Sequence, residues 1–249
     1  MITIIIPCLN EKKNIKLIKK NLSLFNRSDH IIVDGKSRDN SRTVFNKEKL
    51  NFTITAPSRG LQLKKGAEES NTKWLLFLHA DTELNKKNIL EIYNFMSGRN
   101  TLKVGFFKLN YRRKNFLANL ISCWANLRTK IFRLPFGDQG LIISRYYYFK
   151  LGAHSKEKIM EDLEFILRVP KKNRILFNSK ISTSFRKFEK NGIILQGFIH
   201  LLCQSMFLLN LNLMKSLFLT LEIFIVIIES LSLSLQLVRS GSVIHQLSV

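Results

Sequence analysis

The sequence is poor in acidic residues, with 18 Asp and Glu against 40 Lys and Arg. The formal net charge is +22 and the isoelectric point lies near 10.1. Such a charge suits a partner that bears phosphates, whether a nucleic acid, an anionic membrane surface or a nucleotide. Lys, Asn, Ile and Phe are all abundant, which is also typical of an AT-rich genome and would leave many lysines as solvated surface.

Cysteine is scarce as well. Cys8, Cys123 and Cys203 are odd in number and far apart, without a CxxC pair or a His at zinc-finger spacing. This pattern predicts reduced core thiols in a cytosolic protein. A signal peptide is not recognised either, because the apolar run from Met1 to Pro7 is short and lacks a basic region before it and a cleavage site after it. The run is expected to form the first strand.

Short apolar runs alternate with helical patterns through the first 85 residues. Short β-branched and apolar runs that end at turn residues predict strands, and the continuous apolar run from Trp74 to Leu78 predicts a strand buried on both faces. Their alternation with helices predicts a parallel sheet with right-handed crossovers. The expected strands are 2–6, 31–33, 52–56 and 74–78, and the expected helices are 10–25, 41–49 and 59–70.

The order is less regular after residue 85, although no internal repeat or low-complexity linker interrupts it. The segment 116–132 has apolar residues at helical spacing and basic residues near its end, which predicts an amphipathic, basic helix. Further helices are expected at 89–96 and 161–169, and strands at 104–109, 141–144, 175–179 and 181–185. The composition changes after Gly192, which predicts a domain over residues 1–190 and an apolar helical extension over residues 191–249.

The extension contains two apolar segments, Ile193 to Met214 and Leu217 to Val238. The second is long enough to span a membrane, but Glu222 and Glu229 would each cost roughly 2 to 3 kcal/mol near the bilayer centre. The two glutamates are seven residues apart and share one helix face. This spacing favours a helix that lies in the membrane interface, or that packs on a partner such as a second copy in a homodimer, over a membrane span.

Several of the few acids close apolar runs. Asp34 follows a predicted strand at 31–33, Asp81 follows the run at 75–78, and Glu161-Asp162 follows Ile159-Met160. In an open α/β sheet, ligands bind beyond the carboxyl ends of the strands. We therefore expect these carboxylates to face a common crevice in which chemistry takes place.

Six short motifs surround these acids and lie in a fixed order along the chain: Ile4-Ile5-Ile6-Pro7-Cys8-Leu9-Asn10-Glu11, Val33-Asp34-Gly35-Lys36-Ser37-Arg38-Asp39, Ser58-Arg59-Gly60, Phe77-Leu78-His79-Ala80-Asp81-Thr82, Gly137-Asp138-Gln139-Gly140 and Met160-Glu161-Asp162. They occur in the order found in family 2 glycosyltransferases of the GT-A fold, and the chain resembles that family over about residues 1–190. The resemblance is closest to the bacterial subgroup whose metal motif reads His-Ala-Asp. It implies a Rossmann-like, mostly parallel sheet flanked by helices, and a metal-dependent, inverting transfer of sugar from a nucleotide-sugar donor.

The resemblance assigns the nucleotide to the first half of the domain. Asp34 would accept a hydrogen bond from the nucleobase, although an acid after a strand is more often a helix N-cap. Pro7, Glu11 and Ser37 would frame the nucleotide. Arg59 and Gly60 open a helix, where a guanidinium and backbone N–H groups hold phosphate, although an ordinary solvated Arg beside a turn Gly is the alternative.

The resemblance implies that Asp81 binds a divalent cation, Mn²⁺ or Mg²⁺, which takes oxygen ligands and further ones from phosphates. His79 replaces the first acid found in many GT-A enzymes, and it is assigned to the vicinity of the nucleotide or the metal. Asp162 would be the general base. Glu161 is expected near the donor and acceptor, unless it serves only the helix dipole.

The remaining implied site residues lie in the second half of the chain. Asp138 and Gln139 would lie beside the donor sugar and the acceptor, with a plain turn as the alternative. Arg186 would contact the diphosphate, in a segment where Lys187 and Phe188 stand in place of the family's Arg and Trp. These two departures put the closing contact in doubt.

Two other functions remain open from the sequence. One is a basic membrane-surface or nucleotide-binding protein of the same fold without transfer activity, and the other is a nucleotidyltransferase, whose Gly-rich phosphate loop is missing near the first strand. The expected partners are a nucleotide-sugar donor, a lipid-linked or hydrophobic acceptor and an anionic membrane, while nucleic acid is disfavoured. We expect a cytoplasmic protein, with segments 116–136 and 193–238 docking it on the inner face of the cell membrane.

Overall fold

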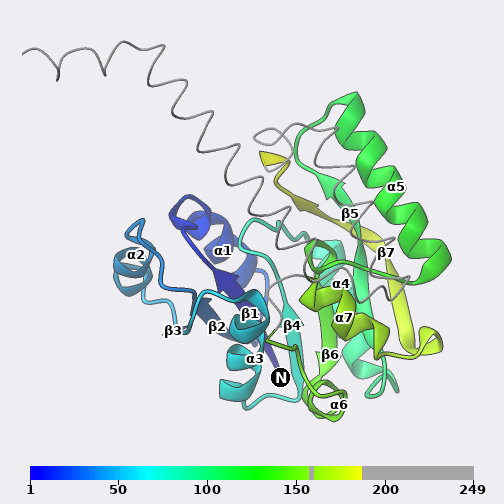
Figure 1. Ribbon diagram of the computed structural model, residues 1–249, viewed down its shortest axis with the longest axis horizontal. Helices are drawn as coiled ribbons and strands as arrows, with labels where there is room; N and C mark the ends of the chain where they lie inside the picture. The colour runs from blue at the N-terminus through cyan, green and yellow to red at the C-terminus, as the bar shows by residue number, and fades with distance from the viewer. Residues whose placement is uncertain (157–159, 187–249) are drawn as a thin grey trace, which may run out of the picture. The chain divides into compact units, whose positions relative to one another are not determined.

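The computed structural model describes residues 1–156 and 160–186, which are drawn in colour in Figure 1. The predicted apolar segments at 193–214 and 217–238, together with Lys187, Phe188 and Cys203, lie outside these residues. The domain boundary near residue 190 therefore stays a prediction. None of the helices within the described ranges is long and apolar enough to cross a bilayer.

The strands of the described residues form one seven-stranded sheet in the order β3-β2-β1-β4-β6-β5-β7. β1 pairs in parallel with β2 and β4, and β5 pairs in parallel with β7. β6 runs antiparallel to both β4 and β5. The predicted α/β class with a mostly parallel sheet is confirmed. The strands are β1 (Ile2–Cys8), β2 (Asp29–Asp34), β3 (Phe52–Ile54), β4 (Trp74–Phe77), β5 (Val104–Tyr111), β6 (Leu141–Ser144) and β7 (Arg174–Thr183).

The helices flank the sheet because its strands are apolar on both faces. Ile4 and Ile6 of β1 belong to the same buried cluster as Ile18 and Ile92, which lie on α1 and α4. The alternate residue Ile5 points to the other face, against α3. The helices are α1 (Ile15–Leu22), α2 (Ser41–Lys47), α3 (Arg59–Glu69), α4 (Lys86–Ser97), α5 (Phe116–Phe132), α6 (Arg145–Lys150) and α7 (Glu161–Leu167), with 3-10 turns η1 (Lys12–Asn14), η2 (Gly137–Gln139) and η3 (Lys171–Asn173).

A glycine allows α3 to pack closely on the sheet. A Cβ atom at Gly66 would lie only 2.5 Å from Cγ2 of Ile5 and 3.1 Å from Cγ2 of Val33. Any side chain at this position would therefore push α3 away from β1 and β2. This close packing fixes the N-terminal end of α3, where Arg59 lies, relative to the ends of these two strands.

The structure differs from several expectations. The predicted strands 175–179 and 181–185 are one strand, β7, whose pairing with β5 shifts register between Phe106 and Lys108. The predicted helix 10–25 is divided into η1 and α1, and α6 was not anticipated. Cys8 is buried as expected, but Cys123 is exposed on α5, so the prediction of a core thiol is wrong there.

Candidate active site at the strand ends

The loops after β1 and β2 are tied to each other by short hydrogen bonds. The backbone N–H of Asn10 donates to Oγ of the buried Ser37 at 2.9 Å, and the N–H of Arg38 donates to Oδ1 of Asn10 at 2.8 Å. Asn10 adopts a left-handed conformation with φ of 56°, which Asn tolerates better than most residues. The hydroxyl of Ser37 therefore holds the first loop in place, and its role beside a nucleotide stays a prediction.

Asp34 ends β2 and is fully buried. Its Oδ2 accepts from the N–H of Ser37 at 3.0 Å and lies 3.7 Å from Nε of Arg42. Its Oδ1 is buried and has no hydrogen-bond partner within the described part of the chain. Asp34 is not a helix N-cap, because α2 begins at Ser41 after Asn40. A buried carboxylate oxygen of this kind is costly unless a ligand donates to it.

Glu11 and Arg186 lie close together although they are far apart in the sequence. Oε2 of Glu11 accepts from Nδ2 of Asn14 at 2.6 Å and lies 3.7 Å from a terminal nitrogen of Arg186. Pro7 is part of β1 and pairs with Val33 of β2. The structure thus brings together two of the residues predicted to contact the nucleotide, Glu11 and Arg186, while Pro7 lies within β1.

Arg59, the first residue of α3, is held by Glu161. The distance between Nε of Arg59 and Oε1 of Glu161 is 3.1 Å, and Glu161 is buried at the start of α7. A Cβ atom at Gly60 would lie 2.0 Å from the carbonyl oxygen of Ser155, so only glycine allows the chain to approach here. The N-cap of α7 is Met160, and Glu161 therefore positions Arg59 in addition to favouring the helix dipole.

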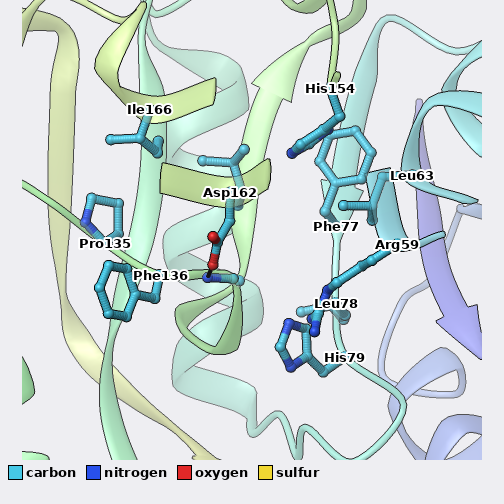
Figure 2. A pocket seen from close by; sticks show the side chains of 13 residues that line it. Arg59, Leu63, Phe77, Leu78, His79, Pro135, Phe136, His154, Asp162 and Ile166 are labelled. Atoms are coloured by element: carbon cyan, nitrogen blue, oxygen red, sulfur yellow. Dashed lines mark hydrogen bonds between the residues drawn. The ribbon is translucent and has the colours of Figure 1, made fainter. Parts of the chain in front are cut away.

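Three predicted site residues, Arg59, His79 and Asp162, meet at Gly137. A Cβ atom at Gly137 would lie 3.0 Å from Nε2 of His79, 3.1 Å from Oδ2 of Asp162 and 3.6 Å from a terminal nitrogen of Arg59. Oδ2 of Asp162 accepts from the N–H of Gly137 at 2.6 Å. Figure 2 shows this bond, and Arg59 extending toward the ring of His79. These three residues and Gly137 line one pocket, with Pro135 and Phe136 beside them.

Asp138 and Arg128 carry the charges behind this loop. Burial raises the pKa of Asp138 to about 6, and the nearby Arg128 opposes this rise. The guanidinium of Arg128 lies over the ring of Phe136 at 3.7 Å from its centre, and burial lowers the pKa of Arg128. Its Nε is buried without a hydrogen-bond partner among the described residues. The sequence reasoning missed Arg128, which it treated only as a basic residue of an amphipathic helix.

Gln139 is buried and holds the loop from inside the fold. Its Oε1 accepts from Oγ1 of Thr129 at 3.0 Å and from the N–H of Phe136 at 3.1 Å. Its Nε2 donates to the carbonyl of Phe107 at 2.9 Å. The side chain of Gln139 therefore connects α5, η2 and β5, and its place beside the donor sugar stays a prediction.

Asp81 lies just beyond β4, and a hydrogen bond to its own carbonyl oxygen fixes its backbone. A terminal nitrogen of Arg112 donates to the carbonyl oxygen of Asp81 at 2.8 Å, a contact that the sequence reasoning did not anticipate. No group of three His, Cys, Asp or Glu side chains around a common point occurs within residues 1–156 and 160–186. A single carboxylate at a strand end fits a hard cation that takes most of its oxygen ligands from phosphates and water.

The comparisons with known proteins show the family and the fold of the chain. The model of the family described as glycosyl transferase family 2 matches residues 3–158. No curated protein matches the sequence. Among solved structures, S. aureus TarS 1-349 superimposes with a TM-score of 0.58 at 17% identity, over 74% of this chain and 60% of that one. The chain thus spans less than two thirds of TarS 1-349.

Two further structures share the fold. The mannosyltransferase PcManGT from Pyrobaculum calidifontis, in complex with GDP-Man and Mn²⁺, has a TM-score of 0.56 at 11% identity, over 74% of this chain and 56% of that one. Glucosyl-3-phosphoglycerate synthase from Mycobacterium tuberculosis, in complex with Mn²⁺, UDP and glucosyl-3-phosphoglycerate, has a TM-score of 0.55 at 11% identity, over 74% of this chain and 70% of that one. At these identities the likeness establishes the GT-A fold.

Proposed function

The chain belongs to glycosyl transferase family 2, and on this basis we propose that it transfers a sugar from a nucleotide-sugar donor to an acceptor hydroxyl by metal-assisted, inverting displacement. One observation carries the proposal. The carboxylate of Asp162 is held by Gly137 in the same pocket as Arg59 and His79. A carboxylate held in place to act as the base, beside a guanidinium that can pair with phosphate, is the minimum that such a transfer needs.

The donor nucleotide would bind across the ends of β1 and β2. Oδ1 of Asp34 is a buried acceptor to which a nucleobase N–H can donate. Arg59, oriented by Glu161, would pair with the diphosphate, as a guanidinium suits phosphate oxygens. Arg186 lies beside Glu11 at the same edge and would contact the diphosphate from the other side.

A divalent cation, Mn²⁺ or Mg²⁺, would be held by Asp81, with His79 nearby. When bound, the cation supplies charge neutralisation to the departing diphosphate. Two of the similar structures contain Mn²⁺, which supports a cation of this kind. We also assign the chain to the subgroup with a His-Ala-Asp motif, because His79-Ala80-Asp81 directly follows the run that contains β4.

Asp162 would act as the general base. Its Oδ2 accepts from the N–H of Gly137 at 2.6 Å and its Oδ1 from the N–H of Leu163 at 2.8 Å. These bonds fix the direction of the carboxylate, while each oxygen keeps a lone pair for the acceptor hydroxyl. The deprotonated hydroxyl would attack the anomeric carbon from the side opposite the diphosphate, so the configuration inverts.

The decisive experiment measures donor turnover by the full chain with Mn²⁺ and a panel of nucleotide sugars. We expect Asp162→Asn to lower kcat by about 10²- to 10⁴-fold, the usual contribution of a general base, without weakening nucleotide binding. Glu164→Gln is the matched control on α7, because Glu164 pairs with Arg168 at 2.8 Å and does not line the pocket. The proposal fails if Asp162→Asn turns over as fast as this control.

A further inference from the structure

Helix α5 differs from an ordinary amphipathic helix in the size of the side chains that it buries. The residues that it buries are small: Ala118, Ser122, Ala125 and Thr129. It is fixed to β5 by polar contacts, because Nδ2 of Asn126 donates to the carbonyl of Leu109 at 2.8 Å and its Oδ1 accepts from the N–H of the same residue at 2.7 Å. The inner face of α5 therefore needs no large apolar residue to hold it to the sheet.

The large apolar side chains of α5 face outward instead. Phe116, Leu120, Trp124, Leu127 and Ile131 form a row that we call the outer stripe. Their exposed fractions are 79%, 56%, 54%, 47% and 60%. Steps of four, four, three and four residues put them on one side of the helix. A continuous apolar surface of this kind marks an interaction site, whereas isolated exposed apolar residues need no explanation.

Basic residues flank the outer stripe at both ends. Lys114 precedes the helix, and Lys130 and Arg133 lie at its end; all three are exposed. No Asp or Glu occurs between Glu91 and Asp138 in the sequence. The surface is thus apolar in the middle and positively charged at its ends, and it carries a Trp at its centre, the residue enriched at membrane interfaces.

The charge distinguishes between the candidate occupants of the outer stripe. A second copy of the chain would bring its own basic flanks against these, because a two-fold contact pairs the same surface with itself. The chain beyond residue 186 carries four Lys and Arg and only three Asp and Glu, so it offers no acidic complement. Anionic lipid headgroups provide both the negative charge and the apolar interior below it.

We propose that α5 is a membrane-docking helix, with the outer stripe inserted into the interface of an anionic bilayer and Lys114, Lys130 and Arg133 against the headgroups. The chain continues from α5 through Pro135 into the pocket lining, and the bond from Thr129 to Gln139 fixes the helix to that loop. Docking would hold the pocket beside the bilayer. If the proposed transfer is correct, on which this last step rests, the acceptor is lipid-linked.

Figure 1 shows where this surface lies. α5 is at the end of the sheet with β5 and β7, whereas β3 is at the opposite end. The nucleotide residues of β1 and β2 are therefore separated from the proposed docking helix by the middle strands. This separation leaves the donor side accessible from the aqueous phase while α5 lies on lipid.

The two tryptophans of the chain allow a direct test on the unmodified protein. Trp74 is buried, with 2% of its surface exposed, whereas 54% of Trp124 is exposed. With vesicles of phosphatidylcholine and phosphatidylglycerol that contain brominated acyl chains, we expect the emission of Trp124 to shift to shorter wavelength and to be quenched. Trp124→Phe should abolish this response. An unquenched Trp124 on vesicles that have bound the protein would overturn the proposal.

A pair of variants tests the outer stripe by vesicle flotation. Leu120→Glu should lower the vesicle partition coefficient of the full chain at least about tenfold, since it exchanges apolar burial for a charge next to anionic lipid. Leu90→Glu is the matched control, because Leu90 of α4 is 61% exposed. Equal partitioning of the two variants contradicts the proposal, as does a dimer in solution that only Leu120→Glu dissociates. Asp162→Asn should bind vesicles as the wild type does, so a failed transfer assay and failed docking are distinguishable.

Discussion

The two halves of the sheet differ in how their strands pair and in which side chains α1 and α5 expose. From β1 to β4, strands pair in parallel, and α1 buries large residues, Ile15 and Ile18 among them, and exposes lysines. From β5 to β7, the antiparallel β6 interrupts the order, and α5 buries small residues and exposes large ones. In the first half, α1 thus presents a charged surface to solvent, whereas in the second half α5 presents an apolar surface suited to a partner.

The site divides in the same way. The ends of β1 and β2 supply the buried acceptor oxygen of Asp34 and the loop that Ser37 holds. The second half supplies Asp162, together with the turn that carries Gly137. The proposed mechanism therefore assigns binding of the nucleobase to the first half and proton transfer to the second, while Arg186, which follows β7, would reach the diphosphate from the second half. Asp34 and Asp162 should therefore have separable effects.

The largest expected effect on nucleotide binding is that of Asp34→Ala. Loss of the buried acceptor should raise the nucleotide Kd by about 10- to 100-fold, the usual range for a hydrogen bond to a charged group. The measurement is isothermal titration with UDP and GDP in the presence of Mn²⁺. Asp29→Ala is the control, because Asp29 is exposed at the other end of the same strand. If Asp162→Asn weakens nucleotide binding as much as Asp34→Ala does, the proposed division of roles between the two halves of the sheet is wrong.

Gly60→Ala tests the contact between α3 and the segment before α7. The new Cβ would lie 2.0 Å from the backbone carbonyl oxygen of Ser155, and backbone cannot yield as a side chain can. We expect a loss of about 1 to 3 kcal/mol in the free energy of unfolding, measured by urea denaturation. Gly98→Ala is the control: its nearest neighbour is the side-chain amide of Asn100 at 2.7 Å, which can rotate away. Equal losses for the two variants would show that the close approach at Gly60 is not the cause.

The smallest expected effect is a pH dependence that belongs to the second half. Burial lowers the pKa of His154 to about 3, and its ring stacks on Phe165. Because the unfolded chain takes up a proton near pH 6.5 and the folded chain does not, stability should fall as the pH falls from 7 to 5. The expected loss is about 1 to 2 kcal/mol.

Urea denaturation at pH 7, 6 and 5 measures this slope. His154→Gln should flatten it. His30→Gln is the control from the first half, because His30 is only partly buried at the start of β2 and its pKa is lowered less. An unchanged slope in His154→Gln would show that another group causes the acid sensitivity.

The strands of the first half were predictable from the sequence because short apolar, β-branched runs end at turn residues. Trp74 to Leu78 contains no polar residue, so the position of Asp81 just beyond a strand end followed directly. In the second half, Lys180 interrupts β7, and the single strand was predicted as two. The periodicity of α5 was recognised, but which face of it is buried depends on the small residues that fit against β5, and this is a tertiary property.

The site residues that were missed share a physical reason. Arg112 contacts the backbone of Asp81, which is 31 residues away in the sequence, and Arg128 lies over the ring of Phe136 in the loop after α5. In a chain with 40 Lys and Arg, no local signal separates these two from solvated surface. Glu161 was recognised as an acid at a helix start, but its pairing with Arg59 required the approach of α3 and α7.

The turn η2 has a mechanical consequence. Its first residue, Gly137, donates to Asp162 of α7, and its last residue, Gln139, accepts from Thr129 of α5. The turn η2 therefore links α5 to the carboxylate of Asp162. A tilt of α5 on the sheet would change the direction in which Asp162 points. If α5 docks on a membrane and Asp162 is the general base, as proposed, docking would therefore orient the base.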